Sequence, residues 1–226
     1  MQQQDEQSVD NSADMPRRRT SPAAWYALLL IAGLGLSVWI PVGSANRTAR
    51  AESRGEQLAR IVLEEAVLLM PEDLRDPVFP GLLLGRVLAA AQRDGVFVED
   101  LELLDKGRLE AVTLANKHYC IQLRWSATAD DRANSPHDGR VPALEALAWP
   151  LDPAGPAHAA FFFPEDAEPA YTRNLSAGYV GIEPDHWPKP AQAHRRQDGS
   201  NQIWHYRGFD DERWLLIDRP RRTPRP

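Results

Sequence analysis

The feature that most restricts how this chain folds is an uncharged stretch of 21 residues, 23–43. As a helix it is about 31 Å long, which matches the ~30 Å hydrocarbon core of a bilayer. Trp25, Tyr26 and Trp39 lie near its ends, where aromatic rings prefer the headgroup level. The stretch therefore predicts one transmembrane helix over residues 23–43, with the lipid bilayer as its partner.

Basic residues beside this stretch predict its orientation. Arg17, Arg18 and Arg19 precede it closely, and basic residues next to a span favour the cytoplasmic side. We therefore expect a single-pass cell-membrane protein with a cytoplasmic N-terminus and an extracytoplasmic (periplasmic) head. Signal-peptide cleavage is the alternative, because Gly43-Ser44-Ala45 offers a small-residue cleavage site and would release a secreted module.

Composition divides the rest of the chain. Residues 1–22 are polar with few apolar side chains, which predicts a disordered N-terminal tail. Residues 219–226 are basic and interrupted by proline, which predicts a disordered C-terminal tail. Residues 44–218 are left as the head, and their number suits one domain. The net charge of −6 argues against nucleic acid as a partner.

Two helices are expected at the start of the head. Apolar residues recur at spacings of three and four within 44–70, which predicts an amphipathic helix continuing from the span; they are Leu58, Ile61, Val62, Ala66 and Leu69. This stripe fits against a sheet or against a partner's helix. A second, buried helix is expected over 81–93, with Pro80 at its start and Gly95 just past its end.

Strands follow the helices. Apolar and polar residues alternate from Tyr119 to Trp125, the period-two pattern of a strand. Further strands are expected at 143–149, 159–163 and 169–174, followed by a last hairpin that turns at Asp210-Asp211. Helices first and strands later predict an α+β fold: the transmembrane helix extended into the amphipathic helix, a second short helix, and an antiparallel β-sheet head.

The order of these elements resembles that of type IV pilins and pseudopilins. The residues nearest to their pattern are YCIQLRWS (119–126) and LEALAWPLDPAGPAHAAFFFPEDAEPAYTRNL (144–175). The resemblance implies a pilin-like head in a bacterial envelope protein of unknown function. Prepilins carry Gly-Phe before the apolar run and a glutamate five residues into the mature helix. Pro22-Ala23-Ala24-Trp25 stands there instead, so filament assembly is not implied.

Histidine and cysteine spacing predicts neither a metal nor a cofactor. No pair has metal-ligand spacing such as HExxH among the six histidines, which are His118, His137, His158, His186, His194 and His205. His118 and Cys120 share one face of a predicted strand, which is too few ligands for zinc. Cys120 is the single cysteine, so it forms no intramolecular disulfide and is expected to be a small buried or half-buried side chain. The catalytic residues are left unknown.

Acidic and aromatic residues cluster in the second half of the chain. Acidic residues gather at three expected turns, where aspartate is favoured by the backbone; these are Asp130-Asp131, Glu165 to Glu168, and Asp210 to Glu212. Glu165 to Glu168 lacks the pattern of a calcium loop. Aromatic residues predict a small core or, alternatively, a binding face; these are Trp149, Trp187, Trp204, Trp214, Tyr171, Tyr179 and Tyr206.

These observations favour a membrane-anchored envelope protein whose non-catalytic head serves binding or structure, with an unknown protein partner. The alternative is a membrane-tethered enzyme of unknown class that uses His118, His205 or the carboxylates near Asp210. A concave pocket holding two or more of these groups within hydrogen-bond reach would favour the enzyme. Side chains that point to separate faces would exclude it.

Overall fold

The computed structural model divides the chain into two compact units, residues 1–43 and 44–226. It describes residues 22–70, 74, 76–96, 98, 100–104, 111–126, 143–189, 191–196 and 204–217, with the backbone alone at 22–24, 32–42 and 184. The sheet belongs to the second unit. The expected disordered tails lie outside the described residues, apart from Pro22, which begins the first helix.

The first helix, α1 (Pro22–Leu69), is 48 residues long and ends where Met70 adopts a positive φ of 45°. As far as the described residues extend, no helix is long and apolar enough to cross a membrane. The predicted transmembrane helix over 23–43 is therefore wrong, and so is the fold class that included it. The uncharged residues 23–43 are only one part of α1. The helix continues without a break into turns that carry the charged residues Arg47, Arg50 and Glu52. The side chains of 32–42 lie outside the described residues.

The second helix, α2 (Phe79–Arg93), agrees with the prediction for 81–93. Pro80 occupies its first turn, where a missing N–H is harmless. At its end Gly95 has a φ of +68°, Val96 N donates to Ala91 O at 2.8 Å, and Gly95 N donates to Gln92 O at 3.3 Å. This pair of bonds is a Schellman motif, which satisfies carbonyls left open by the last helical turn.

Eight strands of the described chain form one antiparallel sheet in the order β1-β2-β3-β4-β5-β6-β8-β7. The strands are β1 (Glu102–Leu103), β2 (Ala111–Ala115), β3 (Tyr119–Trp125), β4 (Leu144–Pro150), β5 (Ala160–Pro164), β6 (Ala170–Thr172), β7 (His205–Arg207) and β8 (Arg213–Leu216). Those predicted at 119–125, 143–149, 159–163 and 169–174 and in the last hairpin correspond to β3–β8. β1 and β2 were not predicted. The outer side of β7 is partly paired through a bridge between Arg195 and Gly208.

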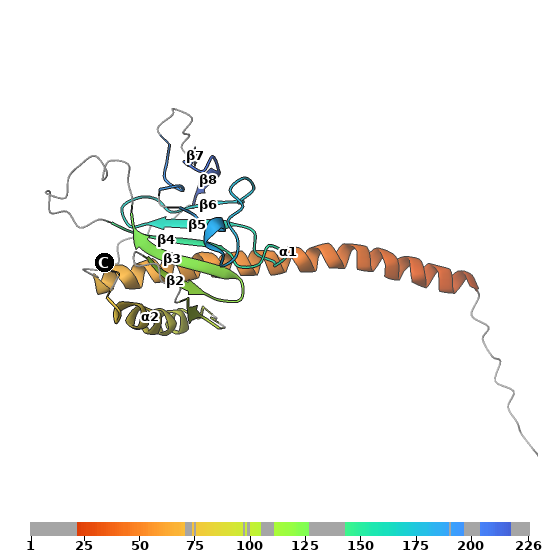
Figure 1. The fold of residues 1–226 in the computed structure, drawn as a ribbon. Helices are drawn as coiled ribbons and strands as arrows, with labels where there is room; N and C mark the ends of the chain where they lie inside the picture. The colour runs from red at the N-terminus through yellow and green to blue at the C-terminus, as the bar shows by residue number, and fades with distance from the viewer. Residues whose placement is uncertain are drawn as a thin grey trace, which may run out of the picture. The chain divides into compact units, whose positions relative to one another are not determined.

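One face of the sheet, the helix face, packs against α1 and α2 (Figure 1). Its side chains alternate along the strands and are almost all apolar; they include Val112, Leu114, Ile121, Leu123, Ala146, Phe161 and Phe163. Leu58 and Val62 of α1 and Leu83 and Val87 of α2 meet them, each with no more than 1% of its surface exposed. The apolar stripe of residues 58–69 therefore packs within the same chain.

The opposite face of the sheet, the second face, is also buried. Irregular chain covers it: the covering segment, residues 173–196, which includes the short 3-10 helix η1 (Pro184–His186). The core beneath it contains most of the aromatic residues noted in the sequence, including Trp149, Tyr179, Trp187, Tyr206 and Trp214. The aromatic cluster is thus a core, although Trp204 lies outside it and is exposed.

Candidate ligand-binding site

A charged pair is buried on the second face, where β3 ends and β4 begins. Arg124 of β3 and Glu145 of β4 are cross-strand partners, and Arg124 Nε donates to Glu145 Oε1 at 2.5 Å. Only 4% of Arg124 and 0% of Glu145 is exposed. A buried charge is costly unless it is paired and hydrogen-bonded, so the register of β3 on β4 fixes both side chains together.

His194 of the covering segment completes this cluster. Its Nε2 lies 2.6 Å from the second carboxylate oxygen of Glu145 and 3.5 Å from the hydroxyl of Ser126. Burial opposes ionisation of Glu145, but the His194 hydrogen bond and the Arg124 charge outweigh it and lower its pKa. Because an ionised carboxylate only accepts hydrogen bonds, Nε2 of His194 carries a proton.

The same cluster holds the covering segment on the sheet. Arg124 Nη1 donates to Pro188 O at 2.9 Å, and Arg124 Nη2 donates to Lys189 O at 3.1 Å. These two carbonyls belong to irregular chain, where no neighbouring strand supplies an N–H group for them. The guanidinium therefore links β4 and the covering segment through one rigid fork of donors.

A second polar group secures the turn after β7. Asp210 accepts hydrogen bonds from Tyr179 Oη at 2.6 Å and from Trp214 Nε1 at 3.1 Å. Burial raises the pKa of Asp210, and burial together with the Asp210 carboxylate raises the pKa of Tyr179. Glu212 accepts from Thr172 Oγ1 at 2.8 Å and from the backbone N–H groups of Ser176 and Ala177. The acidic residues of this turn thus organise the fold.

A cavity of about 310 Å³ opens beside His194. Apolar side chains form most of its wall and three polar residues join them; the lining is Phe162, Pro164, Ala167, Glu168, His194, Arg195, Tyr206 and Leu216. The guanidinium carbon of Arg195 lies 5.2 Å from the ring centre of Tyr206, within the range of a cation–π contact. Volume and lining resemble those of small-molecule sites, which are mostly apolar with a few polar groups.

Strand register brings the side chains of the cavity wall to one face of the sheet. Phe162 of β5 pairs with Ala170 of β6, and Ala170 pairs with Leu216 of β8. The three side chains therefore stand in one row on the second face, with a small residue between two large ones. Tyr206 stands beyond them on the same face, since it pairs with Trp214. Phe162, Leu216 and Tyr206 line the cavity, whereas Ala170 is fully buried and does not line it.

The geometry around His194 does not form a nucleophile–histidine–carboxylate triad. In such a triad the two partners bind opposite ring nitrogens. Here Ser126 and Glu145 both approach Nε2. The arrangement fixes the orientation of the ring and one proton, and neither of these two bonds uses Nδ1.

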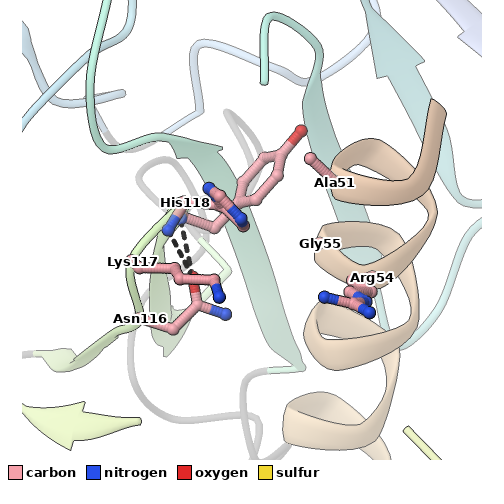
Figure 2. A pocket seen from close by; sticks show the side chains of 7 residues that line it. Ala51, Arg54, Gly55, Asn116, Lys117 and His118 are labelled. Atoms are coloured by element: carbon pink, nitrogen blue, oxygen red, sulfur yellow. Dashed lines mark hydrogen bonds between the residues drawn. The ribbon is translucent and has the colours of Figure 1, made fainter. Parts of the chain in front are cut away.

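The residues proposed for an enzyme are not brought together. His118 lies at the β2–β3 turn, in the pocket of Figure 2. His205 lies on β7, with its Nδ1 3.4 Å from Nη2 of Arg213, and Asp210 follows β7. Strands β4, β5, β6 and β8 separate β3 from β7. By the criterion of a shared pocket, this set of residues does not form an active site.

The other singled-out residues have local roles or are outside the described part. Cys120 is buried and unbridged, as predicted. Glu165 accepts a hydrogen bond from Leu144 N at 2.8 Å. His137 and Asp130-Asp131 lie outside the described residues. Within the described ranges, no group of three or more His, Cys, Asp or Glu side chains is suited to hold a metal ion.

Sequence reasoning missed Arg124, Glu145 and His194 as a set. Two features of the sequence pointed to Arg124 and Glu145. Each is a charged residue in a strand that is otherwise largely apolar, and the two charges are opposite. His194 lies 49 positions from Glu145 in irregular chain, so no spacing rule connects it to either strand.

No family model, no curated protein and no solved structure matches this chain. The likeness to pilin-like heads and the extracytoplasmic location therefore stay predictions from the sequence. Function has to be argued from the sites themselves.

Proposed function

We propose that this chain is a non-catalytic binding domain, and that the cavity beside His194 receives an apolar group of its ligand. The observation that carries the proposal is the cavity itself: about 310 Å³, walled mainly by Phe162, Tyr206 and Leu216. Filling an apolar cavity of this kind removes apolar surface from water, which stabilises a complex by about 25 cal/mol per Å².

The polar residues of the rim favour a ligand with an aromatic or aliphatic body and a hydrogen-bonding tip. Arg195 stacks on Tyr206, and Glu168 and His194 complete the polar part of the wall. Glu145 and Arg124 keep His194 in one orientation from below. Such preorganised walls bind with less loss of side-chain entropy than mobile ones do.

The enzyme alternative is less well supported. A histidine that acts as general base on a nucleophile binds it with the ring nitrogen opposite the one that the carboxylate holds, whereas Glu145 and Ser126 both approach Nε2 of His194. Neither of these two bonds pairs a hydroxyl with Nδ1, the remaining ring nitrogen. We therefore infer a role for the cluster in shaping the site.

Indole is a suitable probe, because it combines an apolar ring with one donor. In a 15N NMR titration of the full chain, we expect saturable shifts at Phe162, Tyr206 and Leu216, since these residues line the cavity. Leu216→Phe places a larger ring in the cavity, and we expect it to weaken indole binding by roughly fivefold, about 1 kcal/mol.

Leu215→Phe is the matched control. Leu215 is the neighbour of Leu216 on β8, so its side chain points to the opposite face of the sheet. We expect this variant to bind indole as the unmodified chain does. Equal binding by both variants, or shifts confined to other regions, would contradict the proposal.

A further inference from the structure

A second pocket lies between α1 and the β2–β3 turn, and basic side chains surround it. Figure 2 shows Arg54 on α1 opposite the turn that carries Asn116, Lys117 and His118. The rest of its lining is Ala51, Gly55 and Tyr119. As described, this lining contains three basic residues and no carboxylate. It shares no residue with the cavity beside His194.

Close packing of the helix against β3 brings the basic residues together. Gly55 faces the ring of Tyr119, and a Cβ at this position would collide with that ring. Glycine therefore lets α1 approach the strand to a distance that any other residue would prevent. Arg54, the preceding residue, is half-buried beside the turn as a result.

The turn itself is rigid. Asn116 Oδ1 accepts hydrogen bonds from His118 N and Tyr119 N, both at 2.8 Å, and Asn116 N donates to Tyr119 O at 2.9 Å. This is an Asx-type arrangement, in which a side chain replaces a backbone acceptor. Lys117 and His118 are thus presented on a fixed loop and not on a mobile one.

Two positively charged side chains act on His118. Partial burial, the charge of Lys117 and the charge of Arg54 all lower its pKa. Glu52, two residues before Arg54 on α1, accepts hydrogen bonds from Ala159 N at 3.3 Å and from Arg173 Nη1 at 3.3 Å. The carboxylate of Glu52 is therefore paired with Arg173.

The volume of the pocket limits what enters it. It measures about 10 Å³, which is close to the space needed for a single water-sized atom. One oxygen of an anion fits, and the remainder of the group has to lie outside, near the side chains of Lys117 and Arg54. A ligand is therefore recognised here by a terminal anionic group.

We propose that this pocket binds a phosphate group, with one phosphate oxygen seated between Arg54, Lys117 and His118. A phosphate presents several oxygens to several donors at once, which suits guanidinium, ammonium and imidazole groups on different elements. It also carries up to two negative charges near neutral pH. A carboxylate has one charge and two oxygens, so it satisfies fewer of these donors.

The test is a titration of the full chain with inorganic phosphate and, separately, with acetate at the same ionic strength. We expect phosphate to shift the NMR signals of His118 and Lys117 saturably and to raise the titration midpoint of His118, because a bound anion favours the protonated ring. Acetate is expected to bind more weakly. Acetate that binds as tightly as phosphate overturns the assignment, as does a titration in which His118 does not respond.

Charge variants distinguish a site from general attraction. Lys117 is exposed at the turn, so Lys117→Gln removes one charge with little risk to folding, and we expect it to weaken phosphate binding roughly fivefold. Lys117→Arg should keep most of the affinity. Lys189→Gln makes the same change at an exposed position outside the pocket and should have no effect. Equal losses in Lys117→Gln and Lys189→Gln would overturn the proposal. This outcome is independent of indole binding beside His194.

Discussion

The two faces of the sheet are buried in different ways. Helices cover the helix face, and the side chains between them and the strands are almost all apolar. Irregular chain covers the second face, and there the sheet contributes Arg124, Glu145 and Thr172 to its buried surface. The difference follows from the backbone of the covering element. A helix satisfies its own N–H and C=O groups, whereas a buried irregular segment needs partners for them.

The second face supplies those partners from side chains. Arg124 donates to two carbonyls of the covering segment, Trp149 Nε1 donates to Gly181 O at 3.0 Å, and Tyr206 Oη donates to Ala193 O at 3.0 Å. Asn174 binds the backbone of Tyr179 with both its oxygen and its nitrogen. Polar groups are thus required on this face, because without them the covering segment would bury unpaired backbone groups.

The largest expected effect is the loss of Glu145. Glu145→Ala leaves the guanidinium of Arg124 buried without its counter-charge and removes the partner of His194, so we expect a loss of about 3–5 kcal/mol in the free energy of unfolding. Urea denaturation measures it. Ile121→Val, on the helix face of β3, is the reference and should lose only about 0.5–1.5 kcal/mol. A loss for Glu145→Ala no larger than that of the reference would show that the second face does not depend on its ion pair.

A smaller effect is expected where α1 touches the helix face. Gly55→Ala forces a methyl group against the ring of Tyr119, and overpacking of this kind costs about 1–3 kcal/mol. Gly85→Ala in α2 is the matched control: nothing lies near its added methyl, and alanine in a helix interior is favoured by about 0.5–1 kcal/mol. We expect Gly55→Ala to lower the midpoint of thermal denaturation and Gly85→Ala to raise it. A higher midpoint in both variants would contradict the close approach of α1 to β3.

The smallest expected effect is a difference between the faces in their response to acid. The lowered pKa of Glu145 means that its ionised form is stabilised by folding. This contribution is present above the ordinary pKa of 4.5 and is lost as the pH falls through the lower, folded-state pKa. The stability advantage of the unmodified chain over Glu145→Gln should therefore shrink on acidification. Asp210 has a raised pKa, but it is present in both proteins and cancels in the comparison.

The reference for the acid experiment is again the helix face. Ile121→Val removes no titratable group, so its difference from the unmodified chain should not change with pH. Urea denaturation at several pH values below neutrality measures both differences. A difference for Glu145→Gln that is constant with pH would show that the carboxyl is not stabilised by Arg124 and His194.

Local patterns predicted the parts of the fold that depend on local physics. Alternation marked β3, and Pro80 and Gly95 marked the ends of α2. β2 was missed because Ala111–Ala115 is short and mainly apolar, so it shows little alternation. The membrane prediction used the length, the lack of charge and the terminal aromatic residues of 23–43, but no helix of the described residues is long and apolar enough to cross a membrane. The covering segment has no period, so its packing on the second face could not be predicted.

The candidate sites depend on contacts that are distant in sequence. Arg124 and Glu145 meet through strand register, and His194 reaches them from irregular chain. The basic pocket needs Gly55 and Tyr119 to touch across α1 and β3. His118 was considered as a candidate from sequence, but its neighbour Arg54 lies 64 residues away by numbering. Individual residues were visible, whereas their association was not.

The two borders of the sheet have a consequence for self-association. On one side β1 is only two residues long, and on the other β7 has part of its outer hydrogen-bonding edge occupied through the Arg195–Gly208 bridge and by the bond from Arg196 N to Arg207 O. A strand with free backbone groups is a template for adding further strands. Within the described chain, such a template is short at one border and partly blocked at the other. Copies of this sheet therefore have little opportunity to join edge to edge.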